Sequence, residues 1–401
     1  MISKVIRLLD IIIEYSVYGL ILLIPFSIAG IGIFAGIAGV SFLIKKIMSP
    51  DFTGIKSNKM LFIFLLLFFI FMALSLFNSG PLISKSLKAL IMKWGRFPLL
   101  IWMILDTFRD PRRIVKAAAV LLFSAALLGI SVLLQKFVHW EIIPGRMPRD
   151  PLLPVSGPFR NQNALAAYLA CVIPIVISFT LGAWEQIAVK SGILLITIML
   201  ITCSIWTFSR GGLIGLIVGL ILVILLTNYH RMEEKVFWRL FLVTYIFIMP
   251  LITLVLFFTN RGSDNERIIL LRGAWHMIKE HPFLGLGLGT FMDHCAQYTN
   301  NFAVSYAHNC YVQIWAESGI FSLLSFLLFA GYVFYRSIKV SLRIPPSLNS
   351  FLLIGLSAGL LGFLVHSFFE VHLYSFQLSF LFWAVLGLAV AMTSCLEQGK
   401  R

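Results

Sequence analysis

The residue best suited to chemistry is His308, near the end of a long polar stretch at 259–318 in an otherwise mostly apolar chain. It stands directly before an apolar helical pattern, and Asn309 follows it. A neutral imidazole can take a proton from a hydroxyl group, and the neighbouring amide can orient the ring or bind a sugar. A hydrogen-bonded histidine at a membrane surface is the simpler alternative. His308 is therefore a candidate general base.

Four arginines are candidates for holding an anion. Arg267 and Arg272 open a helical pattern within the polar stretch, but residues five apart do not share one helix face. Arg210 lies in a very tight turn between two apolar runs, where a turn needs no arginine, and Arg160 precedes a third run. A guanidinium group can bond two phosphate oxygens at once. Each of these side chains could instead snorkel at a helix end.

Asn163 follows Arg160 in a cluster of amides at 161–163. It could cap the helix that starts there, or the cluster could bind sugar hydroxyls. The glycines of 281–289 resemble a nucleotide-binding loop only superficially, because no strand precedes them. They favour turns that let the chain pack closely.

Composition places these residues on a membrane scaffold. Hydrophobic residues make up 59% of the chain and charged residues 12%, about half the charged fraction of a soluble domain. We predict one all-α polytopic domain over 1–401, with the polar stretch 259–318 as a large external helical loop between spans nine and ten. About twelve helices, each near the ~20 residues that a bilayer needs, are predicted at 11–27, 29–43, 61–77, 90–107, 114–137, 163–182, 191–208, 213–227, 240–258, 319–335, 351–365 and 376–392.

The charge distribution gives the orientation. Most of the 32 Lys and Arg fall in loops on the side of both termini, which predicts that these loops are cytoplasmic. The net charge of +15 is explained by this bias and by anionic membrane lipid, so we predict no nucleic-acid partner. Carboxylates are scarce at mid-membrane depth, since Glu14 and Asp106 lie near span ends. This scarcity counts against a coupled transporter.

No metal or cofactor is predicted. The sequence has no D-x-D pattern, and His276 and His281 are five apart, which is a poor match for two ligands on one helix face. Phosphate chemistry here would thus depend on arginines in place of Mg²⁺. Cys295 and Cys310 share the polar stretch, and whether they pair is left open.

Several motifs together resemble the bacterial O-antigen ligase and polymerase superfamily over about 159–322. They are Phe159, Asn161, Asn163-Ala164-Leu165-Ala166, Tyr168-Leu169, Ser209-Arg210-Gly211, Arg267, His281-Pro282, Gly285, Gly287, and His308-Asn309 ahead of Gly319. Their order and spacing carry the resemblance. The first half of the chain matches only as a hydrophobic pattern.

The resemblance implies a GT-C-like glycosyltransferase of the bacterial inner membrane with a periplasmic active site. The implied donor is a glycan on undecaprenyl diphosphate, and the implied acceptor is a sugar hydroxyl of the lipid A–core in lipopolysaccharide biosynthesis. His308 would be the catalytic base, and Arg210 and Arg267 would bind the diphosphate. We add Arg160 and Arg272 as further donor-binding candidates, and Asn309 and Asn163 as acceptor-binding or orienting residues.

One departure leaves alternatives open. Ligases of this family tend to carry a second glycine three residues after the first, but Gly319 is followed by Ile320, Phe321 and Ser322. A polymerase or a protein O-oligosaccharyltransferase of the same superfamily therefore remains possible, and a lipid-linked sugar transporter is the alternative from another class. The roles of four cations before and within the fourth predicted span are undetermined: Lys85, Lys88, Lys93 and Arg96.

Overall fold

The computed structural model describes residues 2–141, 154–182, 187–229, 235–236, 239, 263–299 and 306–398. Within these residues the chain is helical and contains no strand. The helices are α1 (Ile2–Leu23), α2 (Ile28–Met48), α3 (Thr53–Ser57), α4 (Lys59–Leu74), α5 (Ile83–Lys88), α6 (Arg96–Thr107), α7 (Pro111–Leu133), α8 (Gln162–Gly182), α9 (Ile187–Trp206), α10 (Arg210–Asn228), α12 (Ser263–Glu280), α13 (Phe291–Tyr298), α14 (Cys310–Arg343), α15 (Leu348–His366) and α16 (Phe376–Gln398). Short 3₁₀ or π turns cover Ser75–Asn78, Gly80–Leu82, Ala89–Trp94, Leu134–Val138 and His372–Tyr374.

Nine helical segments in the described part are long and apolar enough to cross a membrane: α2, α4, α7, α8, α9, α10, α14, α15 and α16, with α4 and α7 counted together with the short turns that follow them. The chain is thus a multi-pass membrane protein, as predicted. The total of about twelve stays a prediction. Its span at 240–258 lies outside the described residues, α1 carries Asp10 and Glu14, and α6 has only 12 residues.

Small residues bring the central helices together. α15 packs against both α8 and α10. A Cβ added at Gly359 of α15 would lie 2.1 Å from the carbonyl oxygen of Cys171 on α8, and one at Gly215 of α10 would lie 2.4 Å from that of Gly362. Only glycine permits such close approach of two membrane helices. Large buried aromatic side chains, including Trp94 and Trp383, fill the interior beside this trio.

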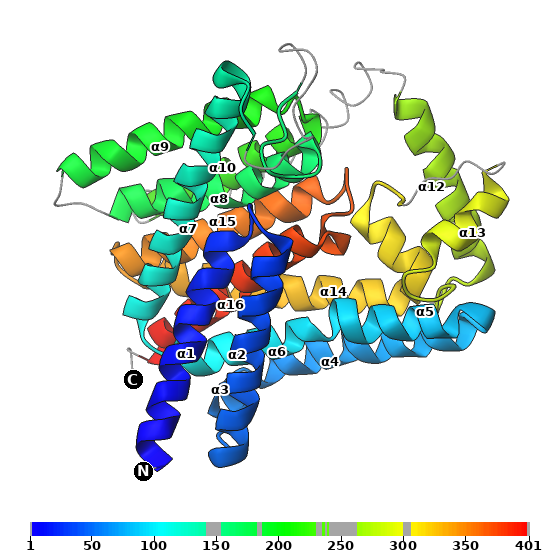
Figure 1. Ribbon diagram of the computed structural model, residues 1–401, viewed down its shortest axis with the longest axis horizontal. Coiled ribbons are helices and arrows are strands. Elements are labelled where there is room, and N and C mark those ends of the chain that lie inside the picture. Colours follow the sequence, from blue (N-terminus) through cyan, green and yellow to red (C-terminus); the bar gives the residue numbers. More distant parts are fainter. Residues whose placement is uncertain are drawn as a thin grey trace.

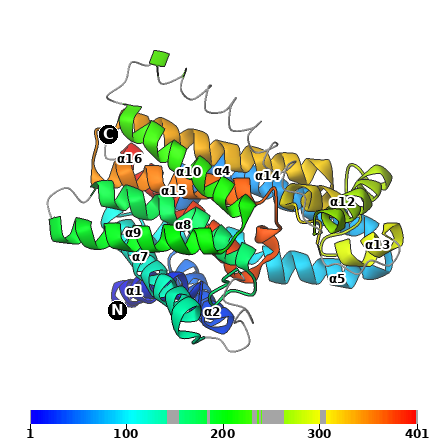
Figure 2. The same ribbon diagram turned by 90° about the horizontal axis from the view of Figure 1, so that it is seen from above.

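The bundle has two distinct ends (Figures 1 and 2). The described chain starts and finishes at one end, whereas α5, α12 and α13 lie at the opposite end. We call the first the Asp106 end and the second the His308 end, after a residue in each. At the Asp106 end, the buried Asp106 carboxylate binds Lys45 at 2.7 Å, Lys46 at 2.8 Å and Arg109 at 2.5 Å. These bonds join α2, α6 and the turn that follows α6.

Candidate active site

His308 is held at the start of α14. Its backbone is left-handed, with φ of 51°, because the chain turns sharply into the helix at this point. The side chain of Asn309 accepts hydrogen bonds from the backbone N–H groups of Tyr311 at 2.9 Å and Val312 at 3.0 Å, so Asn309 is the N-cap of α14. The N–H of Cys310 donates to the carbonyl of Ser367 at 2.9 Å. The carbonyl oxygen of the Asn309 side chain is therefore used to fix the helix that presents His308.

Three side chains from distant parts of the sequence converge on Glu370. His308 Nδ1 lies 3.0 Å from Glu370 Oε2. Asn163 Nδ2 donates to Oε1 at 2.7 Å, and Arg267 Nη2 lies 3.3 Å from the same oxygen. These residues come from the start of α14, from α8, from α12 and from the loop between α15 and α16. Glu370 is thus the residue at which the candidate site is assembled.

The electrostatics of this cluster favour an ionised carboxylate. Burial opposes ionisation of Glu370, but the hydrogen bond from His308 and the charges of His308, His372 and Arg267 outweigh it, so the pKa of Glu370 lies below its usual range. A carboxylate only accepts hydrogen bonds, and His308 Nδ1 must therefore carry the proton between them. The Nε2 atom of a neutral His308 is then a proton acceptor. The His308 side chain is 30% exposed and that of Arg267 34%, so both can be reached by a substrate.

Arg210 begins α10 beside the same loop. Ser209 caps this helix by accepting from the N–H of Gly212 at 3.3 Å. A Cβ at Gly211 would lie 2.7 Å from Phe369, which precedes Glu370, so the first turn of α10 rests directly on the loop. The N-termini of α8, α10 and α14 therefore all meet the Glu370 loop. Helix N-termini carry partial positive charge and favour an anion.

Two of the predicted cations lie apart from the cluster. Arg267 is one helical turn before Leu270, which is buried with Ala274 on the packed face of α12. Arg272 is exposed, as expected from its five-residue offset. Arg160 is also exposed, and neither side chain takes part in the described bonds that join Glu370 to its partners. The structure therefore brings Arg267 into the cluster and leaves Arg160 and Arg272 at the surface.

The helix cap at the start of α8 differs from the sequence-based alternative. Asn161 Oδ1 accepts from the N–H of Ala164 at 2.8 Å, so Asn161 provides the cap. The idea that Asn163 serves as the N-cap is wrong, because its side chain instead donates to Glu370. Asn161 thus caps the helix, and Asn163 binds Glu370.

The glycine-rich turns support α14 from outside. Gly285 and Gly319 both have left-handed backbones, with φ of 70° and 81°. The N–H of Leu286 donates to Ala316 O at 3.0 Å, and that of Ile320 donates to Pro282 O at 3.0 Å. A Cβ at Gly319 would lie 1.9 Å from the carbonyl oxygen of Phe283. The close-packing interpretation of these glycines is confirmed. The helix starts at Cys310, nine residues before the predicted start of the span at Gly319. It is kinked at Gly319.

Glu370 is the member of the cluster that sequence reasoning missed. The predicted spans 351–365 and 376–392 place it only in the connection between them. The signal that could have found it is a lone carboxylate between His366 and His372 in a short connection. Cys295 and Cys310, whose pairing was open, are both free and buried in different hydrophobic clusters.

Part of the chain around this cluster is similar to a known protein family. A model of the O-antigen ligase family matches residues 193–327. This segment of the chain is thus similar to the O-antigen ligase family. The matched segment includes Arg210, Arg267 and His308, whereas Asn163 and Glu370 lie on either side of it.

A curated relative extends the likeness. The teichuronic acid biosynthesis protein TuaE of Bacillus subtilis (strain 168) is 26% identical over 268 residues, which are 61% of this chain and 52% of TuaE. The chain therefore spans about half the length of the relative it matches. The chain is thus similar to a protein of teichuronic acid biosynthesis over part of its length.

Proposed function

We propose that the chain is a metal-independent, inverting glycosyltransferase that moves a glycan from undecaprenyl diphosphate to a sugar hydroxyl. The observation that carries the proposal is the hydrogen bond between His308 Nδ1 and Glu370 Oε2, beside Arg267 and the first turn of α10. We place the His308 end in the periplasm and both termini in the cytoplasm, in a bacterial inner membrane.

In the proposed reaction, the acceptor hydroxyl attacks the anomeric carbon while His308 Nε2 takes its proton. The bond between the anomeric carbon and the diphosphate oxygen breaks, and the electron pair leaves with the diphosphate. Glu370 holds the imidazole in the required tautomer and stabilises the imidazolium that forms. A positioned base contributes about 10²–10⁴-fold to the rate. Attack from the face opposite the leaving group inverts the anomeric centre.

Arg267 and Arg210 are proposed to bind the diphosphate as its charge develops. Arg267 is joined to Glu370 by one Nη2 contact at 3.3 Å, which leaves other N–H donors of its guanidinium available to a ligand. The N-termini of α8, α10 and α14 add partial positive charge at the same place. Fixed donors of this kind contribute about 3–4 kcal/mol each to transition-state stabilisation. Arginines would therefore stabilise the negative charge of the diphosphate, as Mg²⁺ does in other enzymes.

The acceptor distinguishes two candidates. Our first is an O-antigen ligase that transfers the glycan to the lipid A–core, in agreement with the matched family. The second is a polymerase that joins repeat units, and it is favoured by the name of the related protein, since teichuronic acid is a polysaccharide. A deletion strain separates them. Loss of a ligase leaves long polymer on the lipid carrier, whereas loss of a polymerase leaves core bearing a single repeat.

The test of the chemistry is an in-vitro transfer assay in detergent with purified protein, lipid-linked donor and acceptor, and EDTA present. We expect wild-type activity in EDTA and a loss of about 10²–10⁴-fold in His308→Ala. His276→Ala is the matched control, because His276 is exposed on α12 at the same end and stacks on Tyr298. Near-normal transfer by His308→Ala would exclude His308 as the base. Product formation without a second compartment excludes a transporter.

A further inference from the structure

Three cations near the His308 end have no carboxylate partner among the described residues. They are Lys88 at the end of α5, Lys93 in the π turn Ala89–Trp94, and Arg96 at the start of α6. Lys85, which belongs to the same stretch, is paired with Asp293 at 2.5 Å. Lys85 is therefore accounted for by a bond within the protein, whereas the three other charges are not neutralised in the part of the chain that the structure describes.

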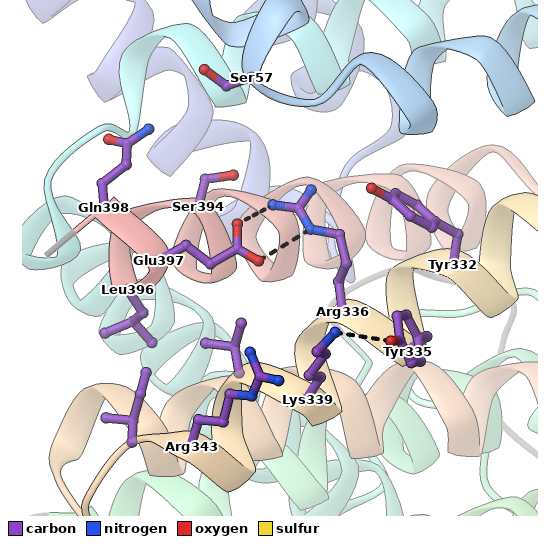
Figure 3. Close-up of a pocket in the computed structure, with 12 residues that line it drawn as sticks. Ser57, Tyr332, Tyr335, Arg336, Lys339, Arg343, Ser394, Leu396, Glu397 and Gln398 are labelled. Atoms are coloured by element: carbon purple, nitrogen blue, oxygen red, sulfur yellow. Dashed lines mark hydrogen bonds and ion pairs between the residues drawn. The ribbon is translucent and has the colours of Figure 1, made fainter. Parts of the chain in front are cut away.

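An arginine at the Asp106 end provides a comparison (Figure 3). It lines a cavity of about 610 Å³. Arg336 Nη2 binds Glu397 Oε2 at 2.5 Å, and Arg336 Nη1 donates to the side chain of Asn58 at 2.6 Å. Both terminal nitrogens of Arg336 are thus occupied by groups of the protein itself. Arg96 differs, because its only hydrogen bond to a described residue uses Nε.

Aromatic rings hold the guanidinium group of Arg96. Its central carbon lies 4.4 Å from the ring centre of Phe376, 4.9 Å from that of Phe380 and 5.1 Å from that of Phe97. Such cation–π contacts suit the flat and weakly hydrated guanidinium group. Nε donates to the backbone carbonyl of Lys93 at 2.9 Å. The position of the group is therefore set by three rings from α6 and α16 and by one carbonyl.

The terminal nitrogens of Arg96 are available to a ligand. A guanidinium group has five N–H donors, and Nε supplies only one of them. The side chain is partly exposed, so a ligand can reach the other four donors. Two parallel N–H groups of an arginine can bond two oxygens of one phosphate. Lys93 is exposed beside the guanidinium and can add a second positive charge, so the pair suits a phosphate group.

The surroundings of Arg96 indicate the kind of phosphate. Ile91 and Met92, in the π turn before it, are 58% and 64% exposed. On a multi-pass membrane protein, large apolar side chains with this exposure face lipid. Cations at the edge of a lipid-facing surface lie at the depth of the lipid headgroups. Cations that the protein leaves unpaired at this depth attract anionic lipid.

We propose that Arg96 and Lys93 bind the phosphate group of an anionic lipid in the leaflet at the His308 end. Nη1 and Nη2 of Arg96 donate to two phosphate oxygens, and the acyl chains lie against Ile91 and Met92. Arg96 packs against the start of α16, directly after the connection that holds Glu370, so a bound lipid would stabilise that connection. The site is independent of the proposed transfer reaction, because neither cation belongs to the Glu370 cluster.

The test compares the thermal unfolding of purified protein in detergent with added phosphatidylglycerol, phosphatidylcholine or inorganic phosphate. A ligand that binds only the folded protein raises the Tm. We expect phosphatidylglycerol to raise it by several degrees and the other two probes to have less than half that effect. In Lys93→Gln/Arg96→Gln the phosphatidylglycerol shift should fall by at least half. Lys56→Gln/Lys59→Gln is the matched control, since it removes two exposed cations three residues apart at the other end, and it should keep the shift.

A second variant keeps the charge. Arg96→Lys loses the planar fork, so its phosphatidylglycerol shift should lie between those of the wild type and Lys93→Gln/Arg96→Gln. Each variant is compared with its own lipid-free Tm, which separates loss of binding from loss of stability. A full shift in Arg96→Lys would overturn the contact with two oxygens. Equal shifts for the two lipids, or equal losses in the two double variants, would overturn the site. A full shift with inorganic phosphate alone would replace the lipid by a soluble anion.

Discussion

Each end of the bundle has a carboxylate that joins several helices, Asp106 at one end and Glu370 at the other, but the two are surrounded differently. The Asp106 side chain is 0% exposed and binds Lys45, Lys46 and Arg109, which belong to α2 and to the turn after α6. Glu370 is 14% exposed, and its partners are an imidazole, an amide and a guanidinium group. Three cations surround the Asp106 carboxylate. The partners of Glu370 include side chains that are themselves partly exposed to solvent.

The difference supports the proposed roles, in which Asp106 joins helices and Glu370 belongs to the proposed active site. Lys45 and Lys46 are only 11% and 7% exposed, and Arg109, although 47% exposed, is bonded to both Asp106 and Asp51. His308 and Arg267 are about a third exposed and have donors or acceptors that the cluster leaves available. A carboxylate that only holds helices together needs full compensation of its charge. A carboxylate that orients a catalytic base must leave the far side of that base accessible.

The largest effect on activity is expected from Glu370→Gln. The amide keeps the size of the side chain but removes the charge that, in the proposed mechanism, fixes the His308 tautomer and stabilises the imidazolium. We expect the transfer rate to fall by about 10²–10⁴-fold, with little change in Tm. Asp293→Asn is the control, because Asp293 forms an exposed ion pair with Lys85 at the same end. Comparable losses in both variants would show that Glu370 has no special role.

The largest effect on stability is expected from Gly319→Ala. A methyl group there requires a left-handed alanine and meets the carbonyl of Phe283, so we expect a loss of about 3–5 kcal/mol in the free energy of unfolding. Gly331→Ala in the same helix has open space and helical geometry, and should gain about 0.5–1 kcal/mol. The measurement is thermal unfolding in detergent. If both variants had equal Tm values, the kink would not support the His308 end.

Asp106→Asn should separate stability from activity. It leaves three cations without their shared carboxylate, although Lys45 keeps Asp10 and Arg109 keeps Asp51. We expect a loss of about 3 kcal/mol in stability and an unchanged transfer rate per folded molecule. Asp51→Asn, which loses a more exposed pair with Arg109, should cost about 1 kcal/mol. A strong loss of rate in Asp106→Asn would show that the two ends are coupled.

The sequence predicted the membrane class and several residues of the candidate site, but not how these residues contact one another. The α-helical membrane class follows from composition, and most helix positions follow from apolar runs, because a bilayer imposes both. His308, Arg210 and Arg267 could be recognised by type and order. Glu370 could not be assigned a role, since its meaning depends on α8, α12 and α14 converging on one short loop. The roles of Asn161 and Asn163 also could not be predicted, because either amide could cap the helix while the other binds a neighbouring side chain.

The last prediction concerns the dependence of stability on pH, which should differ between the two ends. Burial lowers the pKa of His372 to about 4, whereas an unfolded histidine titrates near 6.5. Between these values the unfolded chain binds a proton that the folded chain does not. The free energy of unfolding therefore falls as the pH falls from 6.5 to 4, by up to about 3 kcal/mol.

His372→Phe tests this contribution. The ring of His372 packs against Phe363 and lies 4.3 Å from that of His366, so phenylalanine keeps the ring volume and removes the titrating group. We expect the Tm of the wild type to fall more steeply than that of the variant between pH 7 and pH 4.5. The Asp106 network consists of Asp, Lys and Arg, whose ordinary pKa values lie outside this interval. Asp106→Asn should therefore keep the wild-type slope, and the same slope in His372→Phe would show that acid acts elsewhere.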